Sequence, residues 1–126
     1  RDHSALIIWS GCIEDKNIVV DTPTYSLDIV PTLSNLFGVD YDSRLLVGRD
    51  VFSDQMPLAL WGNYSWKTDK GTYNASKGKF TPNEGVTVPE DYVKTVSATV
   101  RNKIKYSDYV LKNDYFKTLF GANPTQ

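Results

Sequence analysis

The sequence has little of the chemistry that marks many small proteins. Its 126 residues include one cysteine, Cys12, and one histidine, His3. A single thiol cannot form an internal disulfide, and one histidine is too few for the usual zinc sites, so neither a cystine framework nor a zinc finger holds this chain together. The glycines are isolated rather than gathered into a phosphate-binding loop, which leaves nucleotide binding unsupported.

Long apolar runs and a strong net charge are missing as well. The longest apolar run, residues 5–9, is far shorter than the roughly 20 residues of a membrane helix, and no secretion signal opens the chain, so we expect the chain by itself to be soluble. The net charge of -1 excludes a polyelectrolyte tail, but residues 1–60 hold 4 basic and 9 acidic side chains, whereas residues 61–126 hold 10 and 6. This asymmetry indicates either a surface for an anionic partner or a solvated basic face.

The first half of the sequence predicts buried strands and a helix. Hydrophobic residues make up 40% of the chain and aromatic residues 13%, which is enough for one compact domain. Residues 5–9 and 18–20 are short continuous apolar runs, typical of buried strands in a parallel or mixed sheet. Residues 28–37 carry apolar side chains at helical spacing, and Gly38 is a natural C-terminal stop.

The second half predicts an antiparallel meander followed by a long helix. Residues 58–66 alternate between apolar and polar, with Leu58, Leu60, Tyr64 and Trp66 on one face of a strand. Turns at 68–71 and 76–79 separate this strand from a returning strand at 72–75 and from residues 80–81. Pro89 begins a helix in the favoured way, and residues 114–120 predict a last short helix. The apolar stripe expected on the long helix consists of Val93, Val96, Val100, Ile104 and Leu111.

Most residues that could bind a metal or act as a nucleophile have a structural interpretation that fits them better. Asp2 and His3 form the only histidine–carboxylate pair, which supplies at most two metal ligands and is more typical of a polar strand entry. Cys12 has no neighbouring base, so we interpret it as a small turn residue rather than a nucleophile. The acidic pairs lack the spacing of a calcium-binding loop and are interpreted as solvated loop residues: Glu14 and Asp15, Asp40 and Asp42, and Asp50 and Asp54.

An aromatic and basic cluster on the meander is the strongest binding candidate. It consists of Trp61, Tyr64, Trp66 and Tyr73 with Lys67, Lys70, Lys77 and Lys79. Such side chains can stack on sugars or contact phosphates, although aromatic residues of strands more often belong to the core. We name Trp61, Trp66 and Lys67 as the candidate substrate-binding residues.

Two segments carry a resemblance to a known family. Residues 26–39 read SLDIVPTLSNLFGV, and residues 46–52 read LVGRDVF. This pattern resembles sulfatase-like enzymes of the alkaline phosphatase superfamily, and is most similar to the branch of lipoteichoic acid synthases and phosphoglycerol transferases. Residues 105–116 are similar to the tail of that branch.

The resemblance implies an α/β fold in which this chain is a C-terminal fragment of an alkaline-phosphatase-like sandwich. Residues 1–57 would form the end of the sulfatase-like core, with 5–9 as a strand of the main sheet and 28–37 as a helix that covers it. Residues 58–126 would form a small α+β subdomain, in which a small antiparallel sheet packs on a long helix.

The resemblance also implies which functions lie elsewhere. The nucleophile and the metal ligands of the family precede the strand that residues 5–9 match, so no catalytic or metal-binding residue is expected in this chain. Asp2 and His3 do not match the metal pair of the family, because a substantial loop separates that pair from the strand. A divalent metal (manganese, magnesium, calcium or zinc) is implied for the parent enzyme, and no cofactor is expected in this chain.

The expected partners are the remainder of its own polypeptide and an anionic glycerophosphate lipid or polymer, with no nucleic acid. The parent would be anchored in the bacterial cell membrane and face the outside. Two alternatives stay open. The chain could belong to a sulfatase or phosphodiesterase that hydrolyses its ester, or it could be a stand-alone module that binds a glycan or an anionic polymer.

Overall fold

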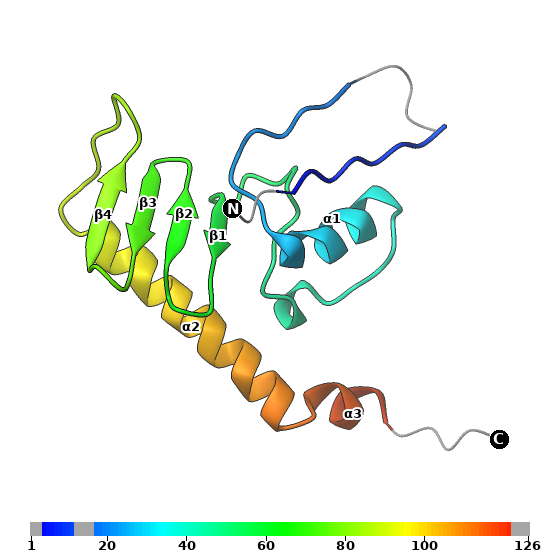
Figure 1. The fold of residues 1–126 in the computed structure, drawn as a ribbon. Helices are drawn as coiled ribbons and strands as arrows, with labels where there is room; N and C mark the ends of the chain where they lie inside the picture. Colours follow the sequence, from blue (N-terminus) through cyan, green and yellow to red (C-terminus); the bar gives the residue numbers. More distant parts are fainter. Residues whose placement is uncertain (1–3, 12–16, 122–126) are drawn as a thin grey trace.

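The computed structural model describes residues 4–11 and 17–121. The chain is a mixed α/β structure with a small antiparallel sheet and helices (Figure 1). Two 3₁₀ turns, Ser26–Asp28 and Ser43–Leu45, flank the first helix. The other elements are α1 (Ile29–Leu36), β1 (Leu58–Leu60), β2 (Trp66–Thr68), β3 (Gly71–Asn74), β4 (Lys79–Pro82), α2 (Tyr92–Lys112) and α3 (Tyr115–Phe120).

The predicted meander is confirmed as a four-stranded sheet in the order β1-β2-β3-β4, with every neighbouring pair antiparallel. Residues 69–70 form the tight turn between β2 and β3, and Gly71 begins β3 at φ +159. A Cβ atom at position 71 would lie 2.5 Å from the carbonyl oxygen of Thr81 and 2.7 Å from the ring of Phe80. Only glycine therefore lets β3 and β4 approach so closely at this point.

The strand predicted over residues 58–66 is instead two strands and a turn. Tyr64 has φ +66, and its amide donates to the Trp61 carbonyl at 2.9 Å. This turn reverses the chain, so β1 and β2 pair with each other through Leu60 and Trp66. The alternation that predicted one long strand thus spans a hairpin, and Tyr64 lies exposed at its tip rather than on the apolar face.

The hydrophobic core lies between the sheet and α2. It is built on Leu58, Trp66, Val96 and Val100, with Leu60, Tyr73, Phe80, Tyr92, Val93 and Ile104 packed around it. Trp66 is completely buried, its ring stacks on Tyr73 with centroids 5.4 Å apart, and its indole nitrogen donates to the Ser97 hydroxyl at 3.0 Å. The ring therefore has an aromatic partner inside the core, and its one polar atom has a hydrogen-bond acceptor.

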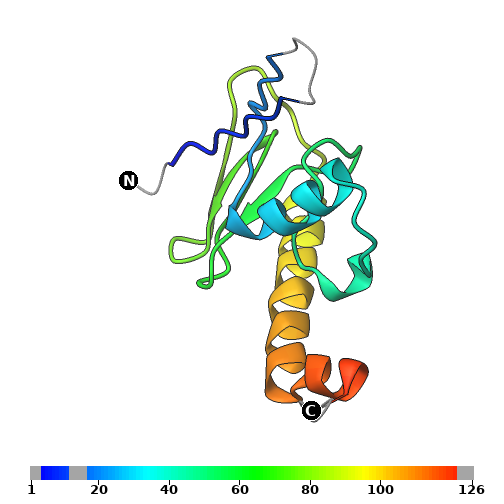
Figure 2. The ribbon, with the colours of Figure 1, turned by 90° about the vertical axis from the view of Figure 1, so that its right-hand side faces the viewer.

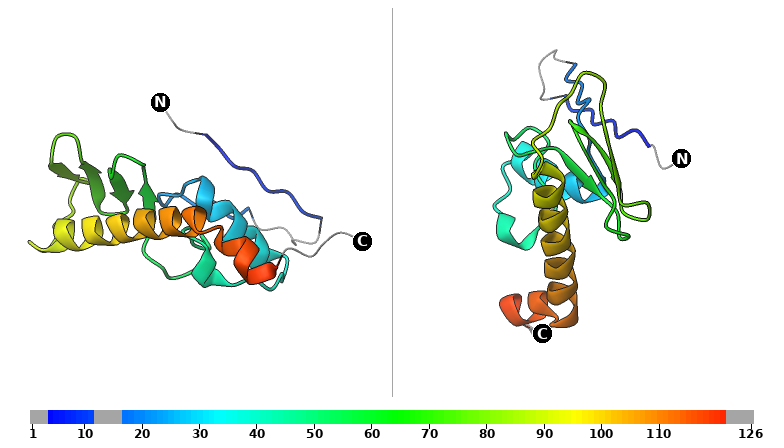
Figure 3. Two further views of the ribbon diagram at one scale, coloured as in Figure 1. Left: turned by 90° about the horizontal axis from the view of Figure 1, so that it is seen from below. Right: turned by 90° about the vertical axis from the view of Figure 1, so that its left-hand side faces the viewer.

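The long helix is confirmed as α2, but it begins at Tyr92 rather than at Pro89, and its apolar stripe needs one correction. Leu111 is 74% exposed, whereas its neighbour Val110 is buried. Figure 3 shows the reason: α2 runs on past the sheet before it meets α3, so its last turns have a different neighbour from its first ones. None of the described helices is long and apolar enough to cross a membrane.

The predicted strands at 5–9 and 18–20 do not form. Both segments run without regular structure, and Ile7 and Trp9 are each 87% exposed. The sheet of the described residues consists of β1 to β4 alone, so these segments have no strand beside them. A continuous apolar run becomes a buried strand only where neighbouring strands and covering helices surround it, and β1 to β4 do not pair with either segment.

The helix predicted at 28–37 is confirmed as α1 with the 3₁₀ turn before it, and Gly38 ends it at φ +62. Its buried side differs from the predicted apolar stripe. Pro31 and Thr32 are buried, whereas Phe37 at the helix end is 63% exposed. Figure 2 shows the chain after α1 descending beside α2, where the Tyr106 hydroxyl donates to the Arg44 carbonyl at 2.8 Å.

Candidate functional site

The side chain of Asp28 joins the two segments that carry the family resemblance. It is 1% exposed, and its Oδ1 accepts a hydrogen bond from the backbone amide of Arg49 at 2.8 Å. Its Oδ2 accepts from the amide of Tyr25 at 3.2 Å. Thr32, one turn further along α1, donates to the Asp28 carbonyl at 2.6 Å and accepts from the amide of Val51 at 3.1 Å. We call these five residues the Asp28 clasp.

The clasp requires a glycine beside Arg49. A Cβ atom on Gly48 would lie 2.0 Å from the carbonyl oxygen of Leu27 and 2.8 Å from the backbone nitrogen of Asp28. Those atoms belong to the backbone and cannot move aside as a flexible side chain would. Gly48 therefore permits the close approach that lets Asp28 reach the Arg49 amide.

The Arg49 side chain extends the network to an earlier part of the chain. It is 6% exposed, and its Nη1 donates to the carbonyls of Asp50 and Val51 at 3.1 and 3.3 Å. Nη2 lies 3.5 Å from the Thr22 hydroxyl, whereas the buried Nε has no hydrogen-bond partner among the described residues. The two hydrogen bonds of Nη1 thus hold the backbone of Asp50 and Val51, which is a structural role.

Lys103 connects α2 to the same network. Its ammonium donates to the Val47 carbonyl at 2.5 Å, directly before the Gly48–Arg49 pair. Burial lowers the pKa of Lys103, and the nearby Asp28 carboxylate partly opposes that shift. Burial raises the pKa of Asp28, against the hydrogen bonds from the Arg49 and Tyr25 amides. Burial, and then the charge of Asp28, raise the pKa of Tyr25 to about 12.

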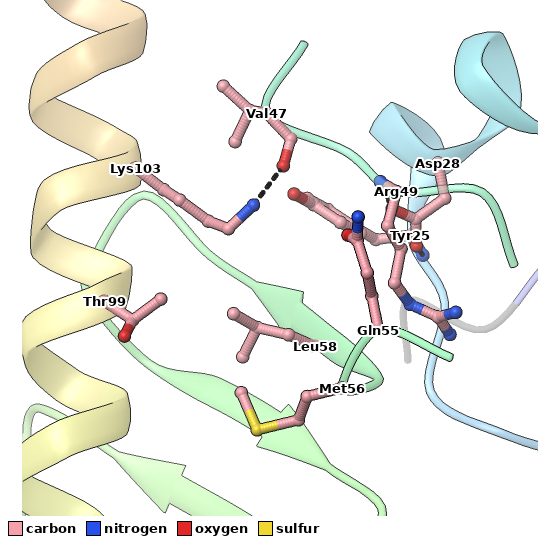
Figure 4. Close-up of a pocket in the computed structure, with 9 residues that line it drawn as sticks. All are labelled: Tyr25, Asp28, Val47, Arg49, Gln55, Met56, Leu58, Thr99 and Lys103. Atoms are coloured by element: carbon pink, nitrogen blue, oxygen red, sulfur yellow. Dashed lines mark hydrogen bonds between the residues drawn. The ribbon is translucent and has the colours of Figure 1, made fainter. Parts of the chain in front are cut away.

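A cavity of about 170 Å³ lies between the clasp, α2 and β1. Figure 4 shows Lys103 reaching across it toward Val47, with Gln55 and the Tyr25 ring on the far side. Its lining is Tyr25, Asp28, Val47, Arg49, Gln55, Met56, Leu58, Thr99 and Lys103. The cavity thus brings residues of the clasp next to residues of α2 and β1.

The described residues provide no metal centre. Across residues 4–11 and 17–121, no three side chains of His, Cys, Asp or Glu gather closely enough to hold an ion. Asp2, His3 and Cys12 lie outside the described residues, as do Glu14 and Asp15. The divalent metal implied for the parent therefore finds no fitting ligand set in the described part of this chain.

Two acidic residues of the loops, Asp42 and Asp50, serve local structure. Asp42 accepts from the amide of Arg44 at 3.0 Å and pairs with its guanidinium at 2.7 Å. The hydrogen bond and charge of Arg44 lower the pKa of Asp42. Asp50 accepts from the Asn35 amide group at 2.8 Å. Both of these carboxylates therefore have a hydrogen-bond donor within the chain.

The structure separates the three predicted binding residues. Trp66 faces α2 and lies in the core, so it cannot touch a ligand on the surface, and its predicted role is wrong. Lys67 is its neighbour along β2 and therefore points to the opposite face of the sheet. Trp61 follows β1 by one residue, donates its amide to the Ser65 carbonyl at 3.0 Å, and is 41% exposed. By alternation, Trp61 shares the face of Lys67.

Sequence reasoning missed two groups of residues. The clasp joins residues that are 21 positions apart, and only the motif pattern pointed to both segments. The sheet face of Lys67 also includes Thr72, Asn74 and Thr81, which the strand register places there and which the sequence analysis did not single out. No protein-family model, curated protein or solved structure matches this chain.

Proposed function

We propose that this chain is the C-terminal portion of a metal-dependent, sulfatase-like phosphoglycerol transferase of the bacterial surface. In this proposal residues 1–57 complete the α/β core and residues 58–126 form a small subdomain beside the substrate cleft. The proposal assigns no catalytic step to this chain, because the resemblance implies that the nucleophile and the metal ligands precede residues 5–9. The chain supports a site that other parts of the polypeptide build.

The observation that carries the proposal is the Asp28 clasp. The segments 26–39 and 46–52, which together carry the resemblance, are bound to each other by the Asp28 carboxylate and the Thr32 hydroxyl. Gly48 is required at the point of closest approach. The residues that the resemblance rests on thus form one interlocked unit, which supports reading them as a single inherited feature of a larger fold.

A second observation supports the remainder of the polypeptide as a partner. Apolar side chains at the start of the chain and around α1 are exposed, and no described residue covers them. They are Leu6, Ile7, Trp9, Ile18, Val19, Leu27, Val30, Phe37 and Val39. Single exposed apolar residues are ordinary, but so many within 34 positions favour a surface that other protein covers.

The test uses the full-length protein encoded around this segment. Its gene should encode membrane spans, a Thr nucleophile and an Asp-His pair before Arg1. The purified protein with Mn²⁺ should transfer glycerophosphate from an anionic glycerophosphate lipid to an acceptor. Release of free glycerophosphate or sulfate without transfer would instead establish the hydrolase alternative. A start codon close to Arg1 would rule out both enzymes and leave the binding module.

A matched pair of variants tests the role given to this segment. Asp28→Asn should lower transferase activity by disturbing the clasp, whereas Lys94→Gln, at an exposed position of α2, should leave it unchanged. Equal activity of both variants and the parent would remove the support for a functional role of the clasp.

A further inference from the structure

On β2 to β4, the face of the sheet that points away from α2 is polar and carries positive charge, whereas on β1 the register places the buried Ala59 on this face. The register pairs Lys67 with Thr72, Thr72 with Thr81, and Asn74 with Lys79, so these side chains share one face. We call this set, together with Trp61, the outer face. In Figure 1 the sheet lies in front of α2, with the outer face of β2 to β4 toward the viewer and no other element across it. Lys79, Thr72, Asn74 and Thr81 are exposed, and Lys67 is half-buried.

Charge on the outer face is of one sign. Of the strand residues that the structure places there, two are lysines and none is acidic. Lys67 and Lys79 lie two strands and two residues apart, which puts their Cα atoms about 12 Å from each other. A ligand that pairs with both ammonium groups must therefore be extended and carry more than one negative charge.

The other side chains of the outer face suit a sugar. Trp61 offers the flat apolar surface of an indole ring, on which the C–H face of a pyranose can lie. Thr72 and Thr81 supply hydroxyl groups, and Asn74 retains amide donors while its Oδ1 accepts from the Lys77 amide at 3.1 Å. A linear polyol phosphate has no ring to place against the indole.

We propose that the outer face binds an acidic polysaccharide. Lys67 and Lys79 pair with the negative groups of the chain, Trp61 stacks against a sugar ring, and the hydroxyl and amide groups of Thr72, Thr81 and Asn74 contact sugar hydroxyls. The inference rests on this face and does not depend on the transferase proposal, because it concerns neither the clasp nor a catalytic site.

The experiment is a calorimetric titration of the 126-residue chain with three polymers of equal length. They are a galacturonate decamer, which is an acidic sugar chain; maltodecaose, which is a neutral one; and a glycerol phosphate decamer, which is charged but has no sugar rings. We expect saturable binding of the galacturonate decamer, weakened by added salt, and much weaker binding of the other two.

Three variants locate the binding. Lys67→Glu with Lys79→Glu, and separately Trp61→Ala, should each weaken galacturonate binding about tenfold. The matched control is Lys94→Glu with Lys105→Glu, which changes the net charge equally on exposed positions of α2 and should alter affinity less than about twofold. If the double variant at the half-buried Lys67 does not fold, Lys79→Glu alone should still weaken binding.

Several outcomes would overturn the proposal. Equal losses in the outer-face and control variants would show attraction by net charge alone. An unchanged affinity of Trp61→Ala, or equally tight binding of the glycerol phosphate decamer, would exclude sugar recognition. Absence of binding to galacturonate in a chain with an unchanged melting temperature would exclude the site itself.

Discussion

The two halves of this chain differ in the kind of interaction that stabilises each of them. Residues 58–121, the sheet–helix half, contain the buried aliphatic and aromatic side chains: Leu58, Ala59, Trp66, Val96, Val100 and Val110. In the half before residue 58, the clasp half, the buried side chains are Asp28, Pro31, Thr32 and Arg49. One half is thus stabilised by apolar burial and the other by a polar network.

The two halves differ in whether their apolar side chains are covered. The sheet–helix half buries Leu58, Trp66, Val96 and Val100 between its own sheet and α2, although Leu111 near the end of α2 stays exposed. The clasp half presents apolar residues such as Val30 and Phe37 to the outside and keeps its shape through hydrogen bonds to backbone. Because its apolar side chains are exposed, the clasp half should be less stable than the sheet–helix half until another surface covers them.

The largest expected effect is in the core of the sheet–helix half. Trp66→Ala removes the ring that contacts Tyr73, Phe80 and Tyr92. We expect the free energy of unfolding to fall by about 3–5 kcal/mol, as measured by urea denaturation followed by circular dichroism. The control is Trp61→Ala, which removes the same kind of side chain from an exposed position and should cost much less. Comparable losses in the two variants would contradict the placement of the core.

The next effect should be confined to the clasp half. Gly48→Ala puts a methyl group against the backbone of Leu27 and Asp28, so the two segments must separate. We expect a local loss of about 2 kcal/mol or more. Hydrogen exchange should rise at the amides of Arg49 and Val51 while β2 and β3 keep their protection. Gly62→Ala is the control, because nothing lies within 4 Å of a Cβ atom there. Faster exchange throughout the sheet would show that the halves are not independent.

The comparison also explains how far the sequence could predict this structure. The meander and the long helix follow from local signals, because alternation, turn residues and the spacing of Val96 and Val100 all act over a few positions. The segments at 5–9 and 18–20 were mispredicted because their apolar runs indicate a buried strand only if partner strands are present. Leu111 was mispredicted because helical spacing alone cannot say where the sheet beneath the helix ends.

The candidate sites show the same limit. Trp66 and Lys67 are adjacent in sequence and were grouped together, yet a strand sends neighbouring side chains to opposite faces. The hairpin at Trp61 and Tyr64 hid which face each aromatic ring takes. The outer face depends on the register of three strand pairs, and the clasp depends on contacts between distant segments. Neither the outer face nor the clasp can therefore be recognised before the tertiary structure is known.

A smaller effect should follow from Asp28→Asn. The Asp28 carboxylate accepts from the backbone amides of Tyr25 and Arg49, and asparagine would turn an NH₂ group toward one of these two donors. We expect the free energy of unfolding to fall by about 1–2 kcal/mol near neutral pH, with the effect confined to the clasp half. Exchange rates at the amides of Tyr25 and Arg49 measure it directly. Thr118→Ala, a hydroxyl change at the exposed far end of the molecule, is the control and should leave those rates unchanged.

The stability difference between the parent and Asp28→Asn should also depend on pH. Burial raises the pKa of Asp28 above its ordinary value of 3.8, so the folded state holds the proton more tightly than the unfolded state. The contribution of this titration to stability is fully present below pH 3.8 and is lost as pH rises through the raised pKa. The stability of the parent relative to Asp28→Asn should therefore fall over that window and then become constant. A difference that increases with pH would reverse the assigned shift.

The smallest effect belongs to the ion pairs on the surface. In the sheet–helix half, Lys112 pairs with Asp108 at 2.7 Å, one helical turn apart, and the two side chains are 72% and 56% exposed. Water and salt screen such a pair, so Lys112→Gln should lower the free energy of unfolding by no more than about 0.5 kcal/mol. The loss should shrink in 1 M NaCl, as urea denaturation at the two ionic strengths can show. A loss near that of Trp66→Ala would mean that exposed charge, rather than the buried ring, stabilises the sheet–helix half.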